Sequence, residues 1–136
     1  MKKIFIINLT FFCFTIGITA QANDYNFIIG LYNLGHNDTS TFKIAISTGE
    51  YGYEYSLQTP NRQETGDLIV SEDAEVVRLT FKNCFYDEPF EGGESVELQA
   101  VYENNAILFQ NYGNSMNDYT VFSGFPKYLI LIKYNR

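Results

Sequence analysis

Two residues of this chain could form a nucleophilic pair. His36 is the single histidine, and Cys84 is the only cysteine besides Cys13. A cysteine nucleophile needs a histidine within hydrogen-bond reach and a third group that orients it, and no spacing here indicates such a set. We therefore expect Cys84 to be a small buried residue at the end of a strand and His36 to be a polar turn residue. Zinc needs three or four nitrogen or sulfur ligands, so we expect no metal, no cofactor and no enzyme activity.

A denser group of polar side chains lies between residues 87 and 94. Four carboxylates surround Phe90 there, and Gly92 and Gly93 allow a close approach of the backbone. An aromatic anchor surrounded by charged groups is typical of an interface hot spot. The sequence therefore predicts a protein-binding site formed by Asp87, Glu88, Phe90, Glu91 and Glu94. Two alternatives are a solvated loop in which Phe90 folds back over the core and a divalent-cation site.

The charge balance indicates the kind of partner. Sixteen acidic residues against nine basic ones give the chain a net charge of −7. An acidic surface repels phosphate groups and anionic lipids, so we expect neither nucleic-acid binding nor a membrane-surface role. The same charge accelerates the capture of basic proteins. We therefore predict a basic protein partner, and the alternative is that the charge serves solubility alone.

The first 22 residues have the pattern of a signal peptide. Lys2 and Lys3 precede the mainly apolar run 4–18, and Ala20 and Ala22 form a small-x-small cleavage site. We expect cleavage after Ala22, a periplasmic or secreted product, and no membrane insertion afterwards. Removal of 22 of the 136 residues leaves 114, which is the length of a single domain, 23–136.

Alternating apolar and polar residues run through most of the remaining chain. This period of two is typical of strands with one buried face. About nine such segments, separated by turn signals, predict an all-β fold, a single antiparallel β-sandwich of the immunoglobulin-like or Greek-key kind. The segments expected to be best protected are Thr41–Thr48, Tyr51–Gln58, Val76–Lys82, Ser95–Glu103 and Tyr128–Tyr134. The expected core residues are Phe42, Ile44, Ile46, Leu79, Phe81, Val96, Leu98, Leu129 and Leu131.

Two short stretches resemble known architectures. The segment 76–83 (VVRLTFKN) followed by 91–102 (EGGESVELQAVY) resembles strands of immunoglobulin-like sandwiches. Phe85, Phe90 and Gly92 are similar to the aromatic-x4-aromatic-x-Gly pattern of βγ-crystallin Greek keys. Each resemblance implies an architecture and carries no function.

Two classes of function remain open. The first is an exported binding or inhibitor module of the cell envelope, similar to an immunity protein, that acts through its acidic surface. The second is a structural or adhesive subunit. In that alternative, Tyr51, Tyr53 and Tyr55 on one strand face form a platform for carbohydrate rings, unless the same face is the interior of the fold.

Overall fold

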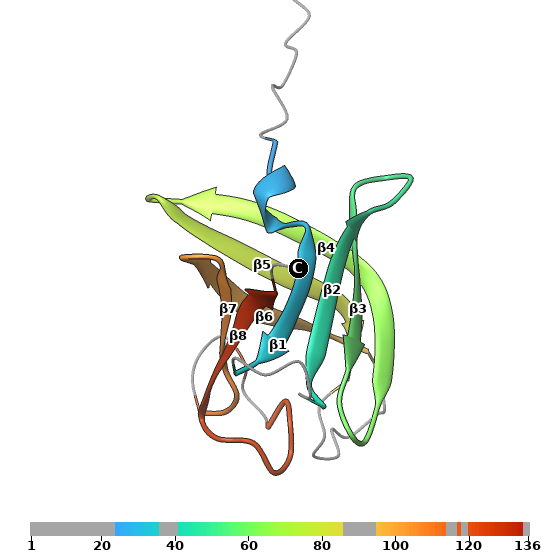
Figure 1. Cartoon of the computed structure of the whole chain (residues 1–136), viewed down its shortest axis with the longest axis vertical. Helices are drawn as coiled ribbons and strands as arrows, with labels where there is room; N and C mark the ends of the chain where they lie inside the picture. Colours follow the sequence, from blue (N-terminus) through green and yellow to red (C-terminus); the bar gives the residue numbers. More distant parts are fainter. Residues whose placement is uncertain (1–23, 36–40, 86–94, 114–116, 118–119, 135–136) are drawn as a thin grey trace, which may run out of the picture.

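The chain folds into a closed antiparallel barrel of eight strands (Figure 1). The computed structural model describes residues 24–35, 41–85, 95–113, 117 and 120–134. Each strand pairs with the next one in the sequence, and the last strand pairs with the first. After a short 3-10 helix, η1 (Asn26–Ile28), the strands are β1 (Gly30–Leu34), β2 (Lys43–Thr48), β3 (Tyr53–Gln58), β4 (Gln63–Asp73), β5 (Val76–Cys84), β6 (Val96–Glu103), β7 (Ala106–Gln110) and β8 (Tyr128–Tyr134).

The all-β antiparallel prediction is confirmed, whereas the predicted sandwich is wrong. A Greek-key or immunoglobulin-like sandwich divides the strands between two sheets and places strands that are distant in sequence side by side. Here the order in space follows the order in sequence, and β1–β8 pairing closes one sheet on itself. Period-two alternation shows that each strand has one buried face, but it does not show what covers that face. In this protein the opposite wall of the same sheet covers it.

Local sequence pattern and structure differ at three elements. The apolar stretch Tyr25–Asn33 has the alternation of one strand, but its first part forms η1 and only the second part enters β1. The polar stretch 59–66, with Pro60, has the composition of a loop, but β4 begins at Gln63 and runs for 11 residues. The short apolar stretch around Val121 and Phe122 has the pattern of a strand, but residues 121–123 form bends and a turn. The 3-10 turn and the long strand both depend on tertiary contacts that local propensity does not show.

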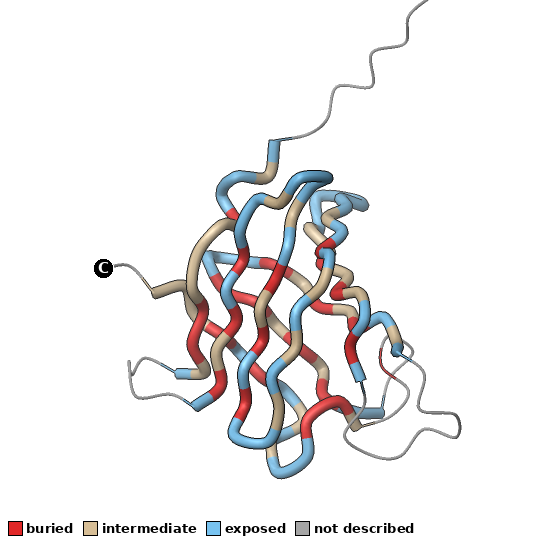
Figure 2. Tube along the Cα trace, turned by 90° about the vertical axis from the view of Figure 1, so that its right-hand side faces the viewer, coloured by how far each residue is buried: buried red, intermediate tan, exposed pale blue. Residues whose placement is uncertain are grey.

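The interior of the barrel holds the predicted core. Buried and exposed residues alternate along the strands, as Figure 2 shows, and the buried hydrophobic side chains form one core cluster. Eight of the nine predicted core residues are buried, and only Val96 is half-buried. Phe81 and Phe109 lie at the centre with ring centroids 5.3 Å apart. Interior side chains fill small barrels of this size, and here aromatic rings supply much of that filling.

The N-terminal turn covers one end of the barrel. Ile28 of η1 is completely buried, and the hydroxyl of Tyr32 donates a hydrogen bond to its carbonyl oxygen. Lys133 Nζ and the hydroxyl of Tyr102 both donate to the carbonyl oxygen of Phe27, at 2.7 and 3.3 Å. The turn is therefore fixed by side chains from three different strands.

The connection between β7 and β8 covers the opposite end. Phe122 is 1% exposed, and its ring lies 4.6 Å from that of Phe42 in an edge-on arrangement. The amide of Asn111 holds this segment, because Asn111 Nδ2 donates to the carbonyl of Phe122 at 2.8 Å while Asn111 Oδ1 accepts from its N–H at 2.7 Å. Both ends of the barrel are thus covered by segments that lie outside the strands.

Candidate functional site

The predicted site in the acidic loop lies outside the described residues. This holds for all five of its members, Asp87, Glu88, Phe90, Glu91 and Glu94. The strands on either side are described: β5 ends at the buried Cys84, and Phe85 after it is 45% exposed. The acidic site therefore stays a prediction.

Cys84 is a buried thiol and no activated nucleophile. Its side chain is fully buried, and its sulfur lies 2.8 Å from the hydroxyl of Tyr55. Burial raises the pKa of the Cys84 thiol to about 12, so the reactive thiolate is scarce at neutral pH. Burial also raises the pKa of Tyr55, and its hydroxyl donates to the carbonyl of Lys82 at 2.6 Å. His36, the other member of the hypothetical pair, lies outside the described residues.

An ion pair stands beside this thiol at the same end of the barrel. Arg62 Nε lies 3.2 Å from Glu64 Oε1, and both side chains are largely buried. The guanidinium also donates to the carbonyl of Phe85 at 2.6 Å and stacks 4.7 Å from the ring centroid of Phe122. These contacts tie the start of β4 to the end of β5 and to the β7–β8 connection. The Arg62–Glu64 ion pair therefore has a structural role, because it holds these three segments together.

The hypothetical tyrosine platform is divided between the interior and the solvent. Tyr55 is only 3% exposed and points into the barrel, whereas Tyr51 at the β2–β3 turn is 94% exposed. Tyr53 is half-buried, and its hydroxyl accepts a hydrogen bond from the N–H of Tyr25. Three rings on one open face would be needed to stack against a sugar surface, and the structure does not provide them.

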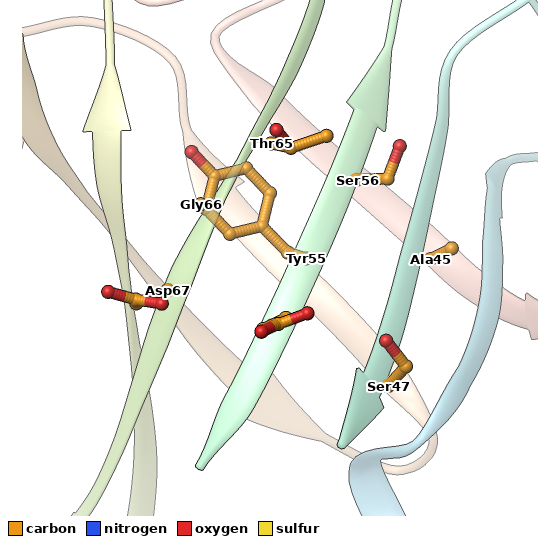
Figure 3. A pocket seen from close by; sticks show the side chains of 8 residues that line it. Ala45, Ser47, Tyr55, Ser56, Thr65, Gly66 and Asp67 are labelled. Atoms are coloured by element: carbon orange, nitrogen blue, oxygen red, sulfur yellow. The ribbon is translucent and has the colours of Figure 1, made fainter. Parts of the chain in front are cut away.

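A polar depression of about 400 Å³ lies over strands β2 to β4. Figure 3 shows the hydroxyl groups of Ser47, Ser56 and Thr65 around it, with the carboxylate of Asp67 on the same wall. Glu54 lies directly opposite Asp67 in the β3–β4 register, and like charges in such positions repel each other. The depression is therefore an acidic, hydroxyl-rich part of the outer surface.

The outer wall over β6, β7 and β8 is apolar, in contrast to the acidic surface over β2 to β4. We define the outer apolar face as Val101, Leu108, Tyr128 and Ile130. Register pairs Val101 with Leu108 and Leu108 with Ile130, so these three form a continuous row across three strands. Tyr128 is 65% exposed and Ile130 is 50% exposed. A contiguous apolar patch on a soluble surface is typical of an interaction site.

This face surrounds a shallow hollow of about 410 Å³ lined almost entirely by apolar atoms. Gln110 lines it together with the four residues of the face. The neighbouring backbone is held by Asn117, which is completely buried. Its amide accepts a hydrogen bond from the N–H of Gln99 and donates to the carbonyls of Gln99 and Gln110, each at 3.1 Å. The amide thus bridges β6 and β7 just beyond their last register pair, at Gln110, which lines the hollow.

The sequence contains a signal for this face. The run YLILIKY at 128–134 is apolar on both sides of the strand, a pattern typical of a central strand that is covered on both faces. In a closed barrel one face of every strand points outward. A strand that is apolar on both faces therefore displays apolar side chains on the surface.

Within the described ranges, no group of three or more histidine, cysteine, aspartate or glutamate residues could hold a metal ion. None of the helices in that part of the chain has the length and apolar character required to cross a membrane. Comparisons with known protein families, with curated proteins and with solved structures find no match for this chain.

Proposed function

We propose that this chain is an exported module that works by binding another protein through the outer wall of its barrel. The observation that carries the proposal is the outer apolar face, where Tyr128 and Ile130 are 65% and 50% exposed in adjacent outward positions of β8. Tyrosine and large aliphatic residues around a hollow supply the buried centre of many protein interfaces. Export is supported by the signal-peptide pattern of residues 1–22.

A rigid wall suits this role. The strands beneath the face belong to a closed sheet, and on their inner side Phe109 and Leu129 are 2% and 1% exposed within the core. A surface that is ordered before contact loses little conformational entropy when a partner binds. The face therefore resembles a preformed docking surface more than an adaptable loop.

Within this class we favour an inhibitor or immunity-type protein. Its support is the net charge of −7 together with the carboxylates of Glu54 and Asp67 on the wall of β2–β4. The structural or adhesive alternative has less support. Tyr55 points inward, so the tyrosine platform does not form. An adhesive subunit could also act through its terminal strand, but β8 is paired with both β7 and β1.

Site-specific photo-crosslinking in the producing cells tests the proposal. A photoreactive phenylalanine analogue replaces Ile130 in one variant and Ser56, on the opposite wall, in a matched control. We expect a covalent complex with another protein from position 130 and none from position 56. Mass spectrometry of the exported chain should show Asn23 as the first residue. Export without a crosslink from position 130 would contradict a docking role for this face.

A further inference from the structure

Part of strand β4 has a neighbouring strand on one side only. β3 begins at Tyr53 and pairs with β4 from Gln63 to Leu68, so the segment Ile69–Asp73 extends beyond it. On the other side, β5 pairs with this segment along its whole length. In Figure 1 the paired ends of β4 and β5 reach past the neighbouring strands. We call Ile69–Asp73 the free edge of β4.

The turn that follows shows which backbone groups of the free edge are available. Ala74 and Glu75 have φ angles of 48° and 68°, as in a type I′ turn, which directs the backbone of Asp73 toward β5. Alternate residues of an antiparallel strand direct their N–H and C=O groups to the same side. Val70 and Glu72 therefore direct theirs away from β5. Among the described residues, no backbone hydrogen bond from outside the ladders reaches either one.

Carboxylates predominate around the free edge. Lys82 of β5 forms an ion pair with Glu97 of β6, which leaves Arg78 as the other cation of β5. The N-terminal turn at this end of the barrel brings one charge of each sign, Asp24 and Lys133. The carboxylates of β4 and its turn are Asp67, Glu72, Asp73 and Glu75.

A hollow of about 260 Å³ lies where β3 ends and β4 continues. Tyr51 and Ile69 line it together with Glu54 and Asp67, and Lys82, which is paired with β6, completes the lining. A lysine or arginine side chain from outside suits such a hollow. Its aliphatic stem contacts apolar groups while its charged end reaches the carboxylates.

We infer that the free edge of β4 accepts an extended basic segment of another protein as an added strand. The segment continues the line of β3, and its backbone forms hydrogen bonds with Val70 and Glu72. One of its lysine or arginine residues occupies the hollow between Tyr51, Glu54 and Asp67, and the acidic rim attracts the others. This contact is separate from the outer apolar face on β6 to β8, so the two can be tested independently.

A second copy of the chain fits the free edge poorly. Two identical edges joined by a twofold axis pair in antiparallel orientation. Because the edge is short, Glu72 and Asp73 of one copy would lie close to the same residues of the other. Like charges in neighbouring positions oppose this arrangement, whereas a basic segment satisfies them.

Two short synthetic peptides test the sign of the charge. One alternates lysine with valine, which favours an extended chain, and its twin carries glutamate in place of lysine. Fluorescence anisotropy of the labelled peptides measures their affinity for the mature protein. We expect the lysine peptide to bind and the glutamate twin to bind at least about tenfold more weakly, because several interface charges change sign.

Amide hydrogen exchange followed by NMR shows whether a strand is added. In the free protein, the N–H groups of Val70 and Glu72 should exchange much faster than those of Ile69 and Ser71, which face β5. Saturation with the lysine peptide should slow the exchange of Val70 and Glu72 by about tenfold or more. A peptide held by charge alone would leave both fast.

Three variants locate the contact. Glu72→Pro removes an N–H on the free side without removing one from the β4–β5 ladder, and it should weaken binding by about tenfold or more. Glu72→Gln keeps that N–H and loses one charge, so it should weaken binding only about twofold to fivefold. Glu103→Gln, on β6, is the matched control for charge and should leave the affinity unchanged. Thermal unfolding checks that each variant is folded, and the exchange data on wild type do not depend on them.

Four results would overturn the inference. Slow exchange of Val70 and Glu72 in the free protein would mean that the edge is already covered. Peptide binding without protection of these amides would mean attraction without an added strand. Protection that grows with protein concentration alone would assign the edge to a second copy. If the lysine peptide does not bind, the edge is no docking site, while a crosslink from position 130 would still support the outer apolar face.

Discussion

The hydroxyl of Tyr55 lies 2.8 Å from the sulfur of Cys84 inside the barrel, and the same hydroxyl donates to the carbonyl of Lys82. One tyrosine of β3 thus reaches across β4 to two positions of β5. Gly66 of β4 makes this possible, because it stands opposite Tyr55 in the register and leaves space for the ring. The contact links three consecutive strands through a single side chain.

The thiol of Cys84 should make the protein sensitive to alkali. Its pKa rises from an ordinary 9.0 to about 12 through burial. Below pH 9 both the folded and the unfolded chain keep the proton, and stability is unaffected. Between pH 9 and 12 only the unfolded chain releases it, so the free energy of unfolding falls as pH rises, by at most about 4 kcal/mol.

Urea unfolding of the mature protein between pH 7 and 11 measures this effect, with Cys84→Ala as the control. The variant should lose less stability over that range, because the buried tyrosines titrate in both proteins and the thiol in only one. Iodoacetamide should label native Cys84 far more slowly than the unfolded chain. Rapid labelling at pH 8 would show that the thiol is accessible and that this account of its environment is wrong.

Replacement of Gly66 by alanine should destabilise the barrel. A Cβ atom at this position would clash with the carbonyl oxygen of Lys82 and lie 3.0 Å from Tyr55 Cε1. Overpacking of this kind typically costs about 1–3 kcal/mol. Thermal unfolding measures the loss, and Thr65→Ala, at the adjacent outward position, is the control. If the Gly66→Ala protein is as stable as wild type, the ring of Tyr55 and the backbone at Lys82 can shift without cost, and the overpacking argument is wrong.

Asn111→Ala should release the segment that covers one end of the barrel. The amide is completely buried and bonds to Phe122 through both its N–H and its carbonyl. Each buried group left without its partner costs about 1–3 kcal/mol. We expect a lower unfolding temperature and faster proteolysis within residues 112–126, as mass spectrometry of the fragments would show. Asn61→Ala, an exposed loop asparagine, should change neither.

The acidic loop provides a separate test of the inhibitor hypothesis. Phe90→Ala should weaken capture of a basic protein partner through the loss of an apolar anchor. Glu91→Lys should weaken this capture most at low salt, because salt screens the interaction between charges at higher concentration. Affinity for a partner identified by crosslinking measures both effects, with circular dichroism as the check on folding. Folded variants that bind as wild type does at either salt concentration would place the site elsewhere.

Local alternation was sufficient to predict most of the strands and their inward faces. Leu79 and Phe81 alternate with Arg78 and Thr80, and the structure places the first pair inside and the second outside. The closure of the sheet could not be predicted in this way. It depends on pairing between Leu31 and Tyr134, which are far apart in the sequence. No short sequence pattern indicates such a contact.

The apolar face was missed for a related reason. A strand apolar on both sides normally lies between two layers, so this pattern alone predicts that Tyr128 and Ile130 are covered. That expectation is correct for a sandwich flanked by other elements and incorrect for the outer wall of a barrel. Similarly, Asn117 could not be recognised as a bridge between β6 and β7, because its contacts with Gln99 and Gln110 come from the fold and not from its neighbours in sequence.

The pairing of β8 with β1 also sets the order in which the protein can form. Strands β1 to β7 can associate one after another as hairpins, but the sheet gains its last two ladders only when residues 128–134 arrive. Until then β1 and β7 each present an unpaired edge, which is a template for association with other chains. An exported chain that crosses a membrane from its N-terminus would carry both edges until its final segment emerges. In a chain exported in this way, the end of translocation and the loss of both unpaired edges would coincide.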